Sequence, residues 1–439
     1  MITTLCILYL LLSVAVPSAA KSNDDWPRWR GPNDDGMARG DAPVEWSDTK
    51  NLAWRVPIPG RGHSSPVIWS DKIFLTTAVP TSQDAPAATP AAPSAVTPDQ
   101  AGGAGAGREH KFVVLCLNRY TGKRLWERVA TVATPHEGYH RGYGSFASNT
   151  PVTDGKHLYA FFGSRGLYCY DLNGKLIWQK QFPPMHIILN LGEGVPTVLD
   201  GDTLYLKFDQ EEGSCLVALD KRTGNELWRV PREEKSSWSP PLVVTHHGRK
   251  QVVVTAPYSV RSYDAATGKL VWECACVGRG VIPAPVAADG LVYVMTGYID
   301  PNLAAIRLGR QGNLKGTDAI VWTNNRGNSY LPSPVLHEHK LYFVADNGML
   351  SCLNAITGEP YYRQQRLPKP YNLKASPVGA NGKLYLATED EDVVVVKMGE
   401  KYEVLAVNTL KDQIFIATPA IAGGSLYLRS QDALFCIRE

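Results

Sequence analysis

The sequence predicts an all-β fold, an eight-bladed β-propeller of four-stranded antiparallel blades. Three observations support this prediction. A hairpin pattern recurs eight times, and a second pattern of turn and strand follows most of its copies. Successive copies are spaced about 42 to 49 residues apart, except for the first gap, and four short strands in a unit of that length are typical of a propeller blade.

The first pattern is a small residue, a proline, an apolar pair, a polar turn and a strand of the Leu-Tyr kind. Its turns contain Asp-Gly, Asn-Gly or Gly-Gly, which suit a tight hairpin because these residues adopt positive φ angles. Each copy predicts the two inner strands of a blade, A and B. The copies begin at Ser65, Thr150, Pro196, Pro240, Ala284, Ser333, Ser376 and Thr418.

The second pattern predicts the outer strands, C and D. A strand ends in Asn or Asp, a Thr-Gly or Asn-Gly turn follows, and the last strand carries a central aromatic residue, as in VALDKRTGNELWRV. The segments GRQGNLKGTDAIVW and VVKMGEKYEVLAV are degenerate versions in blades five and seven. We expect the rings at Trp126, Trp178, Trp228 and Trp272 to fill the space between neighbouring blades, because large rings bury much apolar area.

The two ends of the propeller, which is predicted over residues 51–439, indicate how its ring closes. The last unit stops at its C strand, LFCIRE, while the segment NLAWRV at 51–56 resembles the D strands and precedes the first A strand. We expect this N-terminal strand to complete the last blade. Closure removes the exposed edge that an open sheet offers for aggregation.

Two further segments are expected to lie outside the repeat. Residues 1–20 are predicted to be a signal peptide cleaved after about Ala20, since a short apolar run precedes small residues at Ser18 and Ala20. The protein is therefore expected to be periplasmic or secreted, with no integral membrane segment after cleavage. Residues 80–107 are rich in Ala, Pro, Gly, Thr and Ser, which predicts a disordered low-complexity insertion in blade one.

The segment DWPRWRGPNDDG, within an N-terminal region at 21–50, admits three interpretations: a ligand clamp, a nucleic-acid finger or a structural strap. A formal charge of only +3 argues against nucleic acid as a partner. We favour the strap, with Trp26 and Trp29 packed on the last and first blades. Arg28 and Arg30 are expected to lay their stems along the surface and keep their charges in solvent.

Neither cysteines nor histidines predict a metal site. Seven cysteines remain after cleavage, mostly in apolar strands, and we interpret them as small buried hydrophobes; the close pair Cys274 and Cys276 is assigned no role. His246-His247 and His337-x-His339 fall at A–B turns, where exposed histidines are common. The acidic run 389–392 lacks the spacing of a calcium loop and is expected to be solvated.

The D-x-x-T-G-x-x-x-W units and the eightfold count resemble the pyrroloquinoline-quinone (PQQ) repeat proteins. That superfamily contains quinoprotein alcohol and glucose dehydrogenases and the outer-membrane assembly lipoprotein BamB. The resemblance covers about residues 25–439 and includes the start Trp26-Pro27, the turn at 31–36 and the strand at 52–54. It is closest to uncharacterised exported members. It implies the propeller fold and leaves the activity open.

We expect a non-catalytic, monomeric binding propeller that recognises an envelope protein segment or a saccharide, without a cofactor. The alternative is a soluble dehydrogenase of an alcohol or sugar that depends on PQQ and calcium. No adjacent cysteine pair and no CxxCH haem motif are present, although the glucose dehydrogenase branch can lack both. No Gly-x-Ser-x-Gly, P-loop or His-Glu-x-x-His motif is present either.

In a propeller the D–A and B–C loops meet on one face around the axis, which we call the mouth face. Here these loops combine glycines with cationic and aromatic residues, a composition that suits an anionic ligand or an acidic peptide segment. No catalytic residue is assigned. The candidate ligand-binding residues are Arg61, His63, His140, Arg141, Glu193, Trp238, Arg279, Arg326, Asn328, Tyr330 and Lys374.

Overall fold

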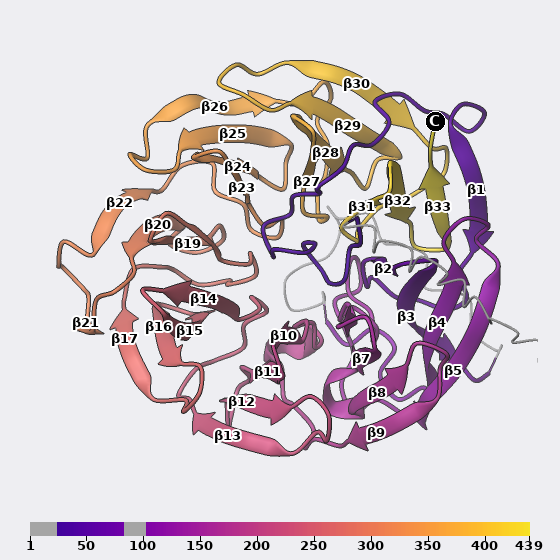
Figure 1. Cartoon of the computed structure of the whole chain (residues 1–439), viewed down its shortest axis with the longest axis horizontal. Helices are drawn as coiled ribbons and strands as arrows, with labels where there is room; N and C mark the ends of the chain where they lie inside the picture. The colour runs from indigo at the N-terminus through magenta and orange to yellow at the C-terminus, as the bar shows by residue number, and fades with distance from the viewer. Residues whose placement is uncertain (1–23, 83–101) are drawn as a thin grey trace, which may run out of the picture.

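The structure is a computed structural model that describes residues 24–82 and 102–439. Eight antiparallel sheets stand around a central axis, with their A strands innermost and their D strands at the rim (Figure 1). The predicted eight-bladed propeller is therefore confirmed. The predicted signal peptide and most of the predicted insertion lie outside the described residues. No helix in the described part of the chain is long and apolar enough to cross a membrane.

Each blade is an antiparallel meander; in blade five β20 pairs with β22, and in blade eight the N-terminal strand β1 pairs with β33. Blades one and two consist of β2 (Val67–Trp69), β3 (Lys72–Pro80), β4 (His110–Asn118) and β5 (Arg124–Ala133), then β6 (Val152–Thr153), β7 (His157–Phe161), β8 (Leu167–Asp171) and β9 (Leu176–Lys180). Blades three and four consist of β10 (Val198–Asp200), β11 (Thr203–Phe208), β12 (Cys215–Asp220) and β13 (Glu226–Pro231), then β14 (Leu242–His246), β15 (Arg249–Ala256), β16 (Ser259–Asp264) and β17 (Leu270–Cys274).

The second half of the ring continues in the same way. Blades five and six consist of β18 (Val286–Ala288), β19 (Leu291–Thr296), β20 (Asn302–Arg307) and β22 (Ile320–Asn324), then β23 (Val335–His337), β24 (Lys340–Val344), β25 (Met349–Asn354) and β26 (Pro360–Arg366). Blades seven and eight consist of β27 (Val378–Ala380), β28 (Lys383–Ala387), β29 (Asp392–Lys397) and β30 (Val404–Thr409), then β31 (Ala420–Ala422), β32 (Ser425–Arg429), β33 (Ala433–Ile437) and β1 (Leu52–Pro57). Two short 3₁₀ turns, η3 (Gly163–Arg165) and η4 (Ile188–Asn190), lie in loops.

The ring closes as the sequence predicts. Strand β1 pairs antiparallel with β33, so that Trp54 lies opposite Cys436, and it supplies the D strand of blade eight. One blade departs from the four-strand prediction. The degenerate segment of blade five forms β21 (Gly312–Asn313), which pairs in parallel with β17 and covers the outer edge of blade four.

The repeat motif acts as a packing device between blades. In the pair formed by blades two and three, Trp178 Nε1 donates to the carbonyl oxygen of Lys221 at 3.1 Å, and its ring covers the Thr-Gly turn of blade three. Gly224 in that turn has a φ of +72°, and a Cβ there would lie 2.8 Å from the ring. Glycine is therefore required both for the backbone angle and for the close approach.

Where Ser or Thr precedes the A-strand proline, its hydroxyl links neighbouring blades near the axis, as at Thr150, Ser333, Ser376 and Thr418. The Ser333 amide donates to Ser376 Oγ at 2.9 Å, and the Ser376 amide donates to Thr418 Oγ1 at 3.2 Å. A hydroxyl at this position satisfies a buried backbone donor of the preceding blade, which a methyl group cannot do. This role explains why Ser or Thr so often precedes the proline.

The N-terminal segment lies across the axis rather than only over the last and first blades. We call residues 26–37 the axial segment; its indigo trace crosses the middle of the ring in Figure 1. Trp26 pairs with Ile68 of blade one, while Trp29 Nε1 donates to Thr418 Oγ1 at 3.0 Å. The expectation that Arg30 keeps its charge in solvent is wrong, because its side chain is 1% exposed. Backbone carbonyl oxygens of the blades near the axis accept hydrogen bonds from the Arg30 guanidinium instead.

Candidate functional site

The mouth face contains an open pocket of about 590 Å³, including space open to solvent, lined by the loops that enter blades two, three, four, five and six. Four of the candidate residues line it, namely His140, Glu193, Trp238 and Tyr330. We call it the mouth pocket. Its full lining consists of His140, Tyr143, Gly144, Ser145, Ser148, Leu191, Gly192, Glu193, Gly194, Trp238, Ile282, Tyr330 and Leu331.

One wall of the mouth pocket is a stack of His140 on Tyr143, with ring centres 3.6 Å apart. Lys374 Nζ lies 5.4 Å from the centre of the Tyr143 ring and 3.7 Å from a carboxylate oxygen of Glu389. Burial, together with the charges of Lys374 and Arg61, lowers the pKa of His140 to about 4. His140 is therefore a neutral ring at physiological pH, and the nearby lysine charge is balanced by Glu389.

Trp238 and Tyr330 are held in place by contacts of their own. Trp238 Nε1 donates to the Gly192 carbonyl oxygen at 2.8 Å. Tyr330 stacks on Tyr298 with ring centres 5.0 Å apart, and its amide donates to Asp346 at 2.8 Å. Rings fixed in this way can receive a ligand without first losing rotamer freedom.

Glu193 is the one carboxylate in the lining of the mouth pocket. It follows β9 in the D–A loop, and its two oxygens accept hydrogen bonds from the amide and hydroxyl of Ser164, at 2.5 and 2.6 Å. Burial raises the pKa of Glu193 to about 7 despite these donors. Near neutral pH the group is therefore poised between its two protonation states.

Three other candidates shape the loops and do not line the mouth pocket. Arg61 donates to the carbonyl oxygens of Gly144 and Gly142 at 2.9 and 3.0 Å. His63 is buried beside the Tyr143 carbonyl oxygen, and burial lowers its pKa to about 3. Asn328 exchanges hydrogen bonds with Asn324 across its own loop.

The remaining cationic candidates lie around the mouth pocket. Arg141, Arg279 and Arg326 are exposed, and none of them forms an ion pair within residues 24–82 and 102–439. Arg141 follows His140, and Arg326 precedes Tyr330 in the same loop. The structure thus brings the aromatic candidates together and leaves three free arginines in the surrounding loops.

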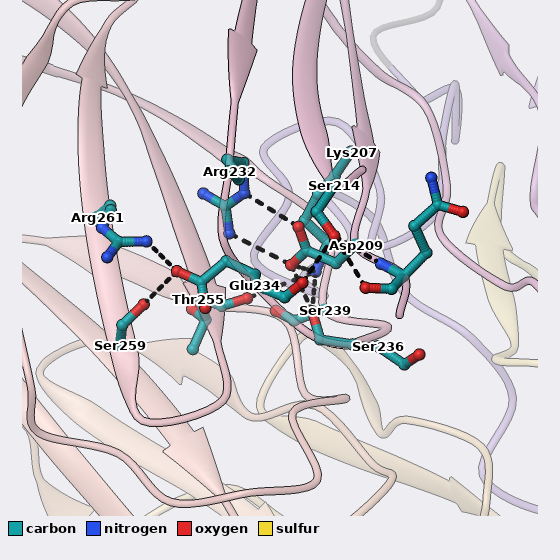
Figure 2. Close-up of polar contacts among 12 residues, drawn as sticks. Lys207, Asp209, Ser214, Arg232, Glu234, Ser236, Ser239, Thr255, Ser259 and Arg261 are labelled. Carbon is teal, nitrogen blue, oxygen red and sulfur yellow. Dashed lines mark hydrogen bonds and ion pairs between the residues drawn. The ribbon is translucent and has the colours of Figure 1, made fainter. Parts of the chain in front are cut away.

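A buried ionic network beneath the mouth pocket was missed by reasoning from sequence (Figure 2). Lys207 and Asp209 are fully buried, with Nζ and Oδ2 3.3 Å apart, and Arg232 contacts the other oxygen of Asp209 at 3.0 Å. Ser237 donates to Asp209 at 2.7 Å. Lys207, Asp209 and Ser237 line a small cavity. Glu193 and Trp238 line both this cavity and the mouth pocket. The available signal was a lysine inside the apolar strand LYLKF.

Charges in this network compensate one another. Burial lowers the pKa of Lys207 to about 8. Burial by itself raises the pKa of Asp209, but Arg232 and Lys207 outweigh this effect and hold it below its usual range. Asp209 is therefore an anion between two cations. We interpret the network as a structural anchor for the loop that carries Trp238.

A quinone cofactor with calcium needs several oxygen ligands that converge on one point. The mouth pocket has one carboxylate, and both of its oxygens are already engaged by Ser164. Within the described ranges, the single group of three convergent ligand residues is His136, Glu137 and His186, which includes two imidazoles. The residues present therefore do not fit a calcium-bound quinone.

Comparisons with known proteins agree with the repeat pattern. A family model described as "Outer membrane protein assembly factor BamB" matches residues 110–216 and 212–315. BamB from Moraxella catarrhalis is similar in structure, with 13% identity over 88% of this chain and 97% of that chain and a TM-score of 0.56. A quinohemoprotein alcohol dehydrogenase from Comamonas testosteroni shows 10% identity over 95% and 81% of the two chains, with a TM-score of 0.58.

A computationally designed protein, Ika8, is also similar, with 9% identity over 76% of this chain and 93% of that chain and a TM-score of 0.52. A search of the curated proteins finds no match to the sequence. The fold and its mouth pocket define an eight-bladed propeller that presents a preformed aromatic cavity. The family-model match over residues 110–315 and the shared propeller fold support the resemblance to the PQQ-repeat proteins noted in the sequence.

Proposed function

We propose that this chain is a non-catalytic binding propeller of the cell envelope, which holds a protein segment or a saccharide in the mouth pocket. The observation that supports this proposal most is the set of four fixed rings, His140, Tyr143, Trp238 and Tyr330. Preformed aromatic walls bind apolar side chains or the C–H faces of sugar rings at low entropic cost.

The polar groups of the mouth pocket also favour binding over catalysis. Ser145 and Ser148 hydrogen-bond to each other at 2.9 Å, and neither is paired with an imidazole or carboxylate that would activate it. Glu193 is held by Ser164, as a positioned acceptor would be. The predicted signal peptide and the match to the BamB family model support an envelope location, and we propose that the protein acts there as a monomer.

The proposal is tested by filling the mouth pocket rather than by deleting its walls. Gly194 lies in the lining, and a Cβ there would meet Trp238 and Ser148 at ordinary contact distances of 3.6 and 3.8 Å. Gly194→Leu should therefore occupy the cavity without backbone strain. Tyr120→Ala serves as the matched control, because Tyr120 is 55% exposed and lies on a C–D turn.

The wild-type protein and both variants are screened against a displayed random-peptide library and a glycan array. We expect wild-type protein and Tyr120→Ala to select the same ligands, and Gly194→Leu to lose them while keeping the same melting temperature within about 3 °C. Ligands that bind Gly194→Leu as well as the wild type would place binding elsewhere. An absence of any ligand for the wild type would contradict the proposal.

A further inference from the structure

We propose that His136, Glu137 and His186 form a binding site for a transition-metal ion, with zinc as the best fit. This inference is independent of the proposed function of the mouth pocket. His136 and Glu137 lie in the loop after β5, and His186 lies in the next D–A loop, after β9. One ligand atom from each residue lies within 4.8 Å of the others.

The side chains are already arranged around a shared point. Glu137 Oε1 accepts a hydrogen bond from His186 Nδ1 at 3.0 Å. The rings of His136 and His186 are nearly perpendicular, with centres 5.7 Å apart and an interplanar angle of 88°. A metal ion at His186 Nδ1 requires the tautomer with its proton on Nε2, so the proton that Nδ1 shares with Glu137 moves to Nε2 through solvent as the metal binds. Zinc binding requires these ligand atoms to draw closer together than the 4.8 Å within which they now lie.

Outer hydrogen bonds orient two of these ligands in the way that metal sites require. His136 Nε2 lies 2.6 Å from the Met185 carbonyl oxygen, which can only accept, so the proton must be on Nε2. That arrangement leaves Nδ1 unprotonated, with a lone pair that a metal could use. Glu137 Oε2 accepts the Ile187 amide at 2.9 Å, so Oε1 faces His186. Backbone partners of this kind hold metal-binding histidines and carboxylates in place.

Arg165 shows that the site attracts a cation. Its Nη2 donates to His136 Nδ1 at 2.6 Å, and thus occupies the lone pair that a metal would use. Arg165 is the last residue of η3, and it is half-buried. A metal must displace this guanidinium, and the arginine therefore competes with metal binding.

The chemistry of the ligand set selects the metal. Two imidazoles and one carboxylate form a three-ligand zinc site with a fourth position left for water, whereas calcium and magnesium prefer oxygen ligands alone. The side chain of His186 is 66% exposed, so an ion reaches the site directly from solvent. Glu137 and Arg165 line a cavity that shares Gly192 and Glu193 with the mouth pocket, so a bound ion would stand beside it.

The test uses the purified protein without a histidine tag, after removal of metals by dialysis against a chelator. Zn²⁺ affinity is measured by competition with a chromophoric chelator, and Co²⁺ is added to reveal tetrahedral coordination by its visible absorption. We expect one Zn²⁺ ion to bind per protein molecule. The affinity should fall at least about tenfold in His136→Ala and in His186→Ala. Arg165→Ala should instead strengthen binding, because the competing cation is gone.

His337→Ala is the matched control, because His337 lies at an A–B turn and its partner is the neighbouring Glu338. It should bind Zn²⁺ like the wild type. Circular dichroism melts establish that each variant is folded. The proposal is overturned if Zn²⁺ does not saturate the wild type, if His337→Ala loses binding as much as His186→Ala, or if Arg165→Ala binds no more tightly.

Discussion

Arg30 donates a hydrogen bond of 2.7 Å to the carbonyl oxygen of Pro377, which lies 347 residues further along the chain. A second bond of 2.5 Å joins it to the Pro334 carbonyl oxygen. Both prolines directly precede an A strand, β27 and β23 respectively. One buried guanidinium therefore ties the axial segment to two neighbouring blades at the centre of the ring.

Arg30→Ala is expected to lower the free energy of unfolding by about 2 to 4 kcal/mol, because it leaves two buried carbonyl groups without donors and opens a cavity. Arg28→Ala is the control. Arg28 also donates to a blade carbonyl, that of Leu199, but its side chain is 23% exposed, so water can replace it. Urea unfolding of both variants measures the difference. Equal losses would contradict the structural role assigned to Arg30.

The sequence was sufficient to predict the blades, because each strand and turn is encoded locally and repeated. It was also sufficient for the closing strand, since LAWRV matches the other D strands. The axial path of residues 26–37 was not predictable in the same way. Arg30 has its partners in blades six and seven, and a non-repeated segment carries no periodic signal of where its acceptors lie.

The candidate site was predictable as a set of loops and not as a set of contacts. His140, Glu193, Trp238 and Tyr330 belong to different D–A loops, and the rule that these loops meet at the axis was enough to select them. Whether an arginine in such a loop faces a ligand or a carbonyl depends on loop conformation. Arg61 binds carbonyls of the neighbouring loop, which no spacing in the sequence indicates.

Asp209→Asn is expected to destabilise the protein by about 3 to 5 kcal/mol, since it leaves Lys207 and Arg232 as buried cations without their anion. The matched control is Asp318→Asn, in an ion pair with Arg310 whose side chains are 77% and 44% exposed. That exposed pair should contribute less than about 1 kcal/mol. Chemical denaturation distinguishes the two. Similar small losses of unfolding free energy in both variants would show that water reaches the network around Asp209.

Addition of PQQ and calcium to the purified protein is expected to produce no dye reduction with a panel of alcohols and aldoses. The reason is that the mouth pocket has the single carboxylate of Glu193, already bonded to Ser164, and so lacks a calcium ligand set. Quenching of tryptophan fluorescence by PQQ provides a second measurement, because Trp238 lies in the pocket wall. Substrate-dependent dye reduction would overturn this expectation.

Glu193 should make the stability of the protein fall as the pH rises. Its pKa is raised to about 7 in the folded protein from 4.5, so the folded state holds the proton more tightly than the unfolded state. The stabilisation that comes from the protonated form is fully present below about pH 4.5 and is lost as the pH rises through 7. Glu193→Gln, which resembles the protonated side chain in shape, should not show this loss.

The measurement is the free energy of unfolding of wild type and Glu193→Gln between pH 4.5 and 8. Taking the difference at each pH removes the contributions of His63, His140 and other groups that titrate in both proteins. We expect the variant to gain about 1 to 2 kcal/mol relative to the wild type across this range, less than the full shift implies because Glu193 keeps some solvent contact. Glu212→Gln, at an exposed position, should show no such gain. A difference that stays flat with pH would mean that Glu193 is ionised in the folded protein throughout, and that Ser164 holds a carboxylate rather than a carboxylic acid.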